Sequence, residues 1–170
     1  MYIIKFGLLL YIKRKGVFMS KIIKENICKR QFNNTIDITD PSYEQDVWCR
    51  LNDIKIIPGE YTCSIWTLPN DRIAKAGIYY NGIIPNYDKM ELIGAIGVDV
   101  AIAGFFNSPK KGYSDVEWDI ICEMFDKNDY VNINDGFMCK SGFGDGSYNV
   151  YGYKRNDNEP YTAIEIIFIY

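Results

Sequence analysis

The chain of 170 residues carries 19 basic and 22 acidic side chains, a formal net charge of −3, no histidine and 15% aromatic residues. A chain of this length can bury a core as one domain without disulfides, and its charge balance argues against phosphate neutralisation, so we predict no nucleic-acid partner. The lack of histidine excludes Ser-His-Asp and Cys-His catalysis and histidine-ligated zinc, while five scattered cysteines without a C-x-x-C pair indicate reduced thiols and a cytoplasmic location.

Residues 1–18 differ from the rest of the chain, because they contain four basic side chains and no acidic one. Their apolar run precedes the basic cluster, the reverse of a secretory signal, and is shorter than the roughly 20 residues of a spanning helix. Lys15-Gly16-Val17 can be encoded by AAA-GGA-GTN, which contains a bacterial ribosome-binding sequence just before the codon of Met19. We therefore expect residues 1–18 to be a translated leader or an extended N-terminal segment. The alternative is a short strand or a membrane-surface anchor.

Between residues 21 and 80 the pattern predicts strands separated by turns. Residues 21–34 are expected to be extended or partly helical, and the alternation in residues 36–39 indicates a short strand. That strand ends at Asp40-Pro41, a dipeptide that favours a turn. Residues 60–68 and 72–80 are predicted to form a hairpin.

Ser42 and Gln45 match a capping box, which predicts one or two helical turns from Tyr43 to about Cys49. Trp48 would then anchor this short helix in the core.

The next two apolar runs, residues 91–98 and 100–106, carry apolar residues or glycine on both sides. We expect central or closely approached strands there. Residues 126–136 form a predicted acidic loop, and further strands are expected at residues 137–140, 148–154 and 161–170.

The clearest local signal is a helix from about Asp115 to Phe125. Ser114 and Glu117 form a capping box before an apolar run with helical spacing. Its apolar stripe is predicted to consist of Val116, Ile120 and Met124, with Trp118, Ile121 and Phe125 alongside. We expect this helix to lie across a sheet.

Taken together, these elements and the high aromatic content predict an α+β fold for residues 19–170 as a single domain. The expected architecture is a largely antiparallel sheet, or two packed sheets, with one principal helix.

The segment Cys139–Arg155 holds the candidate binding site, because its glycines surround one carboxylate and let a ligand approach the backbone closely. It lacks both the G-K-[ST] ending of a phosphate-binding loop and the helix that follows a dinucleotide motif, so a plain hairpin turn is the alternative. Asp99, inside an apolar run, is either exposed at an edge or buried with a hydrogen-bond partner. The candidate ligand-binding residues are Asp99, Gly142, Gly144, Asp145, Gly146 and Tyr148. No catalytic residue, cofactor or metal ligand is assigned.

Three motifs follow one another in the chain: D-P-S-Y at residues 40–43, G-V-D at residues 97–99 and S-G-F-G-D-G-S-Y at residues 141–148. They resemble those of an uncharacterised family of small soluble proteins of Gram-positive bacteria and their phages, with the patterns D-P-C-Y, G-V-D-S-G and S-G-Y-G-D-G-x-Y. Ser42 stands where the family pattern has cysteine, and Val100-Ala101 replaces a small polar pair. The resemblance implies a common fold and a bacterial or phage-encoded origin, and it implies no activity.

Three functional hypotheses follow. The first and favoured one is a non-enzymatic cytoplasmic binding module for a small polar or nucleotide-like ligand, with no membrane partner. The second is a metal-assisted hydrolase that uses Asp40, Asp99 and Asp145 as ligands. The third is a protein-interaction or immunity-type inhibitor that acts through its acidic surface. The first two require the aspartate-glycine segments to converge at one edge of a sheet.

Overall fold

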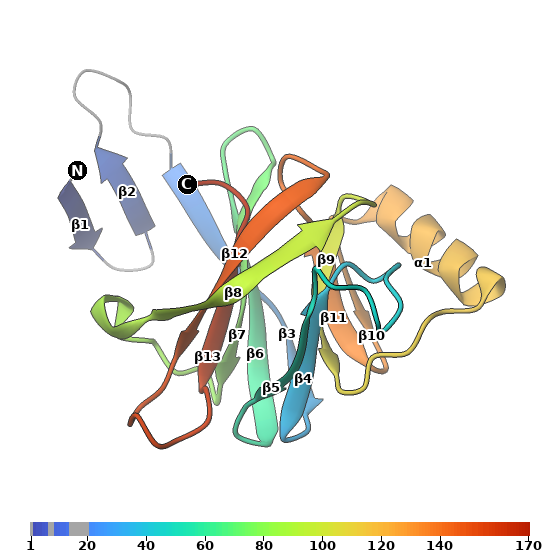
Figure 1. The fold of residues 1–170 in the computed structure, drawn as a ribbon. Helices are drawn as coiled ribbons and strands as arrows, with labels where there is room; N and C mark the ends of the chain where they lie inside the picture. The colour runs from blue at the N-terminus through green and yellow to red at the C-terminus, as the bar shows by residue number, and fades with distance from the viewer. Residues whose placement is uncertain (1, 7–8, 14–20) are drawn as a thin grey trace.

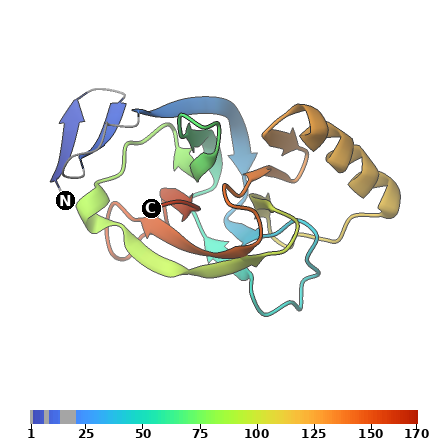
Figure 2. The ribbon, with the colours of Figure 1, turned by 90° about the horizontal axis from the view of Figure 1, so that it is seen from above.

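The computed structural model describes the backbone of residues 2–6, 9–13 and 21–170, and the side chains from residue 22 onward. In this part of the chain the strands form two antiparallel sheets, and one α-helix lies outside the smaller sheet (Figures 1 and 2). This arrangement confirms the α+β fold with two packed sheets and one principal helix.

The larger sheet has eight strands, in which neighbours along the chain are mostly neighbours in space. Its strands, in spatial order, are β1 (Tyr2–Phe6), β2 (Leu9–Lys13), β3 (Lys21–Phe32), β6 (Gly59–Thr67), β7 (Ile73–Tyr80), β13 (Ala163–Ile167), β12 (Gly146–Tyr153) and β8 (Glu91–Val98). β6 and β7 form the expected hairpin. A short 3-10 helix, η1 (Tyr87–Lys89), lies between β7 and β8.

The smaller sheet has five strands. In spatial order they are β10 (Tyr130–Ile133), β11 (Gly136–Lys140), β9 (Ile102–Asn107), β4 (Thr35–Thr39) and β5 (Leu51–Lys55). β10 lies within residues 126–136, which were predicted to be a loop. The tight hairpin with β11 supplies backbone partners for this short polar strand.

The core lies between the two sheets because alternate residues of each strand point inward. Ile36 and Ile38 of β4 and Phe105 of β9 are fully buried, and they belong to one cluster with Ile78 of β7 and Ile164 of β13. Strands that are far apart in the sequence therefore share one apolar interior.

Helix α1 (Asp115–Lys127) covers the outer face of the smaller sheet. The capping box is present as predicted, with the amide of Ser114 donating to Oε2 of Glu117 at 2.8 Å. The buried line of α1 is Ile121 and Phe125, which pack on Phe106 and other residues of the sheet.

The predicted apolar stripe was wrong in its orientation, because Val116 and Ile120 are 70% and 53% exposed. The helix rests on the sheet along one narrow line, so the neighbouring apolar line faces away from the sheet.

Residues 43–49 form turns, so the predicted helix there was wrong, and Trp48 is 92% exposed instead of anchored in the core. The backbone carbonyls of Tyr43 and Glu44 accept hydrogen bonds from the guanidinium of Arg50 at 3.3 and 2.9 Å. Ser42 donates its amide and hydroxyl to Asp40. Two backbone carbonyls that a helix would use are therefore bonded to Arg50, and Ser42 is bonded to Asp40 instead of capping a helix.

β8 is an edge strand of its sheet, which corrects the expectation of a central strand, whereas β9 is central in the smaller sheet. The expectation of close approach is confirmed, because the amide of Gly97 donates to the carbonyl of Cys49 at 2.7 Å. A Cβ at position 97 would lie 2.8 Å from Sγ of Cys49.

Among the described residues, no helix has the length and apolarity needed to cross a membrane. The segment 1–18 is described in part, as the paired strands β1 and β2. Met19 and residues 14–18 lie outside the described residues, so the start of translation stays a prediction.

Candidate functional site

The bend at residues 99–101 carries the chain from β8 in the larger sheet to β9 in the smaller one. Two carboxylates bind its three amides. Oδ2 of Asp40 accepts from the amides of Asp99 and Val100 at 2.8 and 3.0 Å, and Oδ1 of Asp145 accepts from the amide of Ala101 at 3.0 Å. Ala101 has a φ of 58°, a backbone conformation that residues other than glycine rarely adopt. The two carboxylates thus hold an otherwise unfavourable corner.

Asp40 is fully buried, and its second oxygen is also engaged. Oδ1 accepts from the amide and the hydroxyl of Ser42 at 2.8 and 2.6 Å. This carboxylate is therefore a structural anchor that joins the end of β4 to the bend. This position agrees with the turn that the dipeptide Asp40-Pro41 predicts.

The metal-assisted alternative finds no support in this geometry. Both oxygens of Asp40 are occupied by N–H and O–H donors, as described above. Within the described residues, no group of three or more His, Cys, Asp or Glu side chains is placed to hold a metal ion.

The side chain of Asp99 is exposed at the edge of the larger sheet, beside the hydroxyl of Tyr43. Burial, followed by hydrogen bonds with Asp99 and Cys49, raises the pKa of Tyr43 above its ordinary value. Tyr43 therefore stays protonated and can donate to the Asp99 carboxylate.

The glycine-rich loop, residues 141–146, is tied to the same bend. The amide of Ser141 donates to the carbonyl of Ala101 at 2.9 Å. The carbonyl of Gly144 accepts from the hydroxyls of Ser141 and Tyr148 at 2.6 and 2.7 Å. Tyr148 is itself held by edge-to-face contact with Phe168, with ring centroids 5.1 Å apart. The loop is thus held by hydrogen bonds to its own carbonyl group and by the packed ring of Tyr148.

Glycine is required at position 142 for two reasons. Its φ is +69°, and a Cβ there would lie 2.5 Å from the carbonyl oxygen of Ile73. The loop consequently lies directly against the start of β7.

A cavity of about 700 Å³, which we call the glycine-loop cavity, lies between this loop, the bend and α1. Phe143 is 64% exposed at its wall, and the guanidinium carbon of Arg72 lies 5.1 Å from the Phe143 ring centroid. The lining combines two cationic side chains with one carboxylate. The lining residues are Arg72, Val100, Ala101, Ile102, Cys122, Phe125, Asp126, Lys140, Ser141, Gly142, Phe143 and Gly144.

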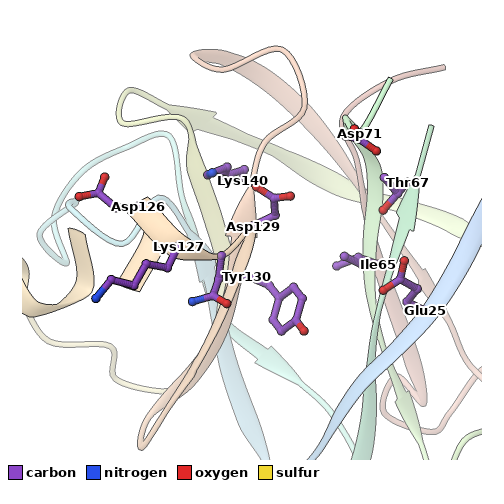
Figure 3. Close-up of a pocket in the computed structure, with 10 residues that line it drawn as sticks. Glu25, Ile65, Thr67, Asp71, Asp126, Lys127, Asp129, Tyr130 and Lys140 are labelled. Carbon is purple, nitrogen blue, oxygen red and sulfur yellow. Dashed lines mark hydrogen bonds and ion pairs between the residues drawn. The ribbon is translucent and has the colours of Figure 1, made fainter. Parts of the chain in front are cut away.

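A second cavity, of about 390 Å³, shares Asp126 and Lys140 with the first. Figure 3 shows that Glu25, Ile65 and Thr67 from the larger sheet, with Asp71 from the turn between β6 and β7, face the end of α1 and β10 across it. Lys140 is paired with Asp129, with Nζ and Oδ1 2.8 Å apart. Because four carboxylates line this cavity against two lysines, we call it the acidic cavity.

The structure brings the predicted site residues together around the bend, but only two of them line the glycine-loop cavity. Gly142 and Gly144 do so, whereas Asp99 and Asp145 lie at the bend. Gly146 begins β12, and the buried Tyr148 supports the loop from below.

Sequence reasoning missed Arg72, Phe143 and Lys140 as lining residues. Arg72 and Lys140 gave no local signal, because they belong to a turn and a strand that are remote from each other in the chain. Phe143 did give a local signal. An apolar residue between two glycines of a polar turn belongs to no apolar pattern that would place it in the core.

No protein-family model matches this chain, and no curated protein or solved structure is significantly similar to it. The resemblance to the uncharacterised Gram-positive and phage family therefore stays a prediction.

Proposed function

We propose that this protein is a non-enzymatic binding module that takes a small polar, nucleotide-like ligand in the glycine-loop cavity. The observation that supports this proposal is the exposed ring of Phe143, which sits between two glycines with positive φ and beside the guanidinium of Arg72. An apolar ring exposed at a cavity wall offers a stacking surface for a planar group.

The charged groups around this ring favour a ligand with an anionic part. Arg72 and Lys140 supply two cations, and a guanidinium can bind a phosphate or carboxylate through paired hydrogen bonds. The amides of residues 142–144 donate to no acceptor in the described part of the chain. Free amides in a glycine-rich turn are suited to anionic oxygens.

The rigidity of the site also supports binding. The bend and the loop are held by Asp40, Asp145 and Tyr148, so little conformational freedom is left to lose when a ligand enters. These aspartates act as positioning residues in this proposal.

Calorimetric titration with adenine and guanine nucleotides, their nucleosides and inorganic phosphate tests the proposal. We expect a nucleotide to bind without being converted to product, and to lose about tenfold or more in affinity in Phe143→Ala and in Arg72→Gln. Leu92→Ala, at another exposed apolar position, and Arg155→Gln, at an exposed arginine outside this cavity, are the matched controls. Equal affinity in all four variants, or no heat with any nucleotide, would contradict the proposal.

A second candidate function, binding of a protein partner, is favoured by the outward side of α1. Val116 and Ile120 form an exposed apolar line among the acidic residues of this helix. Exposed apolar patches rimmed by charge are typical of protein-binding surfaces.

Co-purification with the products of neighbouring genes tests this second candidate. We expect Ile120→Glu to abolish a complex that Ile84→Glu, at an exposed loop position, leaves intact. A complex that survives Ile120→Glu would exclude this face.

A further inference from the structure

Cys28 and Cys63 stand directly opposite each other on the neighbouring strands β3 and β6 (strands labelled in Figure 1). Directly opposed residues of antiparallel strands have Cα atoms roughly 4.5 or 5.5 Å apart, depending on the hydrogen-bonding site. Both separations fall within the range of about 4.4–6.8 Å that a disulfide accepts. The two thiols are hydrogen-bonded to each other, and both are free.

The two cysteines differ in environment. Cys63 is fully buried in the core between the sheets, whereas Cys28 is half-buried and packs at the margin of that core. The guanidinium of Arg30, two residues along β3 on the same face, lies close enough to act on both sulfurs. The hydrogen bond from Cys63, aided by Arg30, lowers the pKa of Cys28, while that bond and burial raise the pKa of Cys63.

This asymmetry divides two chemical tasks between the pair. An accessible thiolate is the species that reacts with an oxidant, and a second thiol nearby can then resolve the product by giving up its proton and attacking the oxidised sulfur. Cys28, the less buried thiol and the one with the lowered pKa, is suited to the first task, and Cys63, directly opposite it, is placed for the second.

None of the other cysteines has this arrangement. Cys139 is buried opposite Tyr130 and Ala103, and Cys122 is exposed on α1. Cys49 contacts Gly97 and the hydroxyl of Tyr43. These three thiols serve as internal controls for reactivity.

We propose that Cys28 and Cys63 form a reversible redox pair that a hydroperoxide converts into a cross-strand disulfide. The Sγ of Cys28 attacks the terminal peroxide oxygen, the O–O bond breaks, and the leaving oxygen takes a proton as water or an alcohol. The Sγ of Cys63 then gives up its proton and attacks the sulfenic sulfur of Cys28, the S–S bond forms, and the hydroxyl takes up a proton and leaves as water. The thiol pair loses two electrons, and the peroxide gains them.

The disulfide would join β3 to β6 covalently in the middle of the larger sheet. Because a cross-link restricts the unfolded chain, the oxidised protein is expected to melt at a higher temperature than the reduced protein.

Peptide mapping of the full chain tests the proposal directly. The protein is reduced, freed of reductant, and treated with one equivalent of hydrogen peroxide before alkylation and tryptic digestion. We expect residues 25–29 linked to residues 56–72, with two of the five thiols lost and both recovered after dithiothreitol. Cys28 left alkylated while Cys122 is oxidised would overturn the proposal.

Two variants separate the roles of the pair. Cys63→Ser is expected to leave a sulfenic acid on Cys28 that dimedone traps, and Cys122→Ser should leave the yield of the linked peptide unchanged. A Cys122→Ser protein that no longer forms the linked peptide would overturn the proposal, as would dimedone labelling confined to other cysteines in Cys63→Ser. The mapping of the unaltered chain decides the question even where Cys63→Ser fails to fold.

Discussion

At the scale of single residues, Asp37 is the polar centre of the smaller sheet. It is fully buried on β4 and pairs with the buried guanidinium of Arg50 at 2.8 Å. Its oxygens also accept from the amides of Asp53 and Lys110 at 3.0 and 2.8 Å and from the hydroxyl of Ser108. One carboxylate therefore satisfies donors from two separate segments, residues 50–53 and 108–110, as a buried charge requires.

Removal of this carboxylate should be costly. We predict that Asp37→Ala lowers the free energy of unfolding by about 3–5 kcal/mol, because it leaves the buried charge of Arg50 without its opposite charge. Lys29→Ala breaks the exposed pair between Lys29 and Glu60 and should cost less than about 1 kcal/mol. Urea unfolding measures both, and equal losses would show that the Asp37–Arg50 pair is not a buried one in solution.

Lys110 is a second buried charge beside this centre. Its Nζ donates to the carbonyl of Pro41 and lies 4.4 Å from the ring centroid of Tyr113. Burial, and after it the charge of Arg50, lowers the pKa of Lys110 from 10.5 to about 8, while Asp135 and other acidic groups act in the opposite direction.

This shift predicts a pH dependence of stability. Between about pH 8 and 10.5 the unfolded chain holds a proton on Lys110 that the folded protein has released. The contribution of Lys110 to the free energy of unfolding therefore increases as the pH rises. The difference in unfolding free energy between the wild type and Lys110→Met should therefore increase across this window, by at most about 1.4 kcal/mol per pH unit. A flat Lys110 difference would contradict the lowered pKa.

At the scale of elements, the two apolar lines of α1 behave differently although they lie side by side. Ile121 packs on the outer face of the smaller sheet and is 4% exposed, whereas Ile120 is 53% exposed. The periodicity is the same for both lines, so the surface beneath the helix decides which line is buried.

A matched pair of substitutions tests this orientation. Ile121→Ala should lower the free energy of unfolding by about 2–4 kcal/mol, because it leaves a cavity on the sheet. Ile120→Ala should change it by less than about 0.5 kcal/mol. Thermal and urea unfolding followed by circular dichroism would show the contrast, and the opposite order would mean that α1 is rotated about its axis.

At the scale of the whole molecule, the two sheets are held together by a shared core and by the connections β3–β4, β5–β6, β8–β9 and β11–β12, each of which joins one sheet to the other. β7 and β13 lie in the interior of the larger sheet and bury Ile78 and Ile164 completely. β5 is an edge strand of the smaller sheet, with largely exposed side chains. Stability is therefore distributed unevenly across the fold.

Amide hydrogen exchange should reveal this distribution. We expect the amides in β7 and β13 to exchange only through global unfolding, and those in β5 to exchange faster through local opening. Heteronuclear NMR spectra recorded after transfer into deuterated water would measure both sets. Similar rates in β7 and β5 would contradict the packing described above.

The sequence by itself determined the structural features that depend on short-range signals. The capping box of Ser114 and Glu117, the hairpin of β6 and β7 and the alternating strands all depend on residues a few positions apart, and the structure has them where they were expected. The α+β class followed from these elements, because their exposed apolar faces can be buried only by packing against one another.

Only the tertiary structure decided which local signals prevail and which residues meet. The capping pattern at Ser42 lost to hydrogen bonds from Arg50, whose buried position depends on Asp37. The bend at residues 99–101 is held by Asp40, 59 positions earlier than Asp99, and by Asp145, 44 positions after Ala101. Such pairings depend on the packing of two whole sheets, and no local pattern in the chain encodes the distance between them.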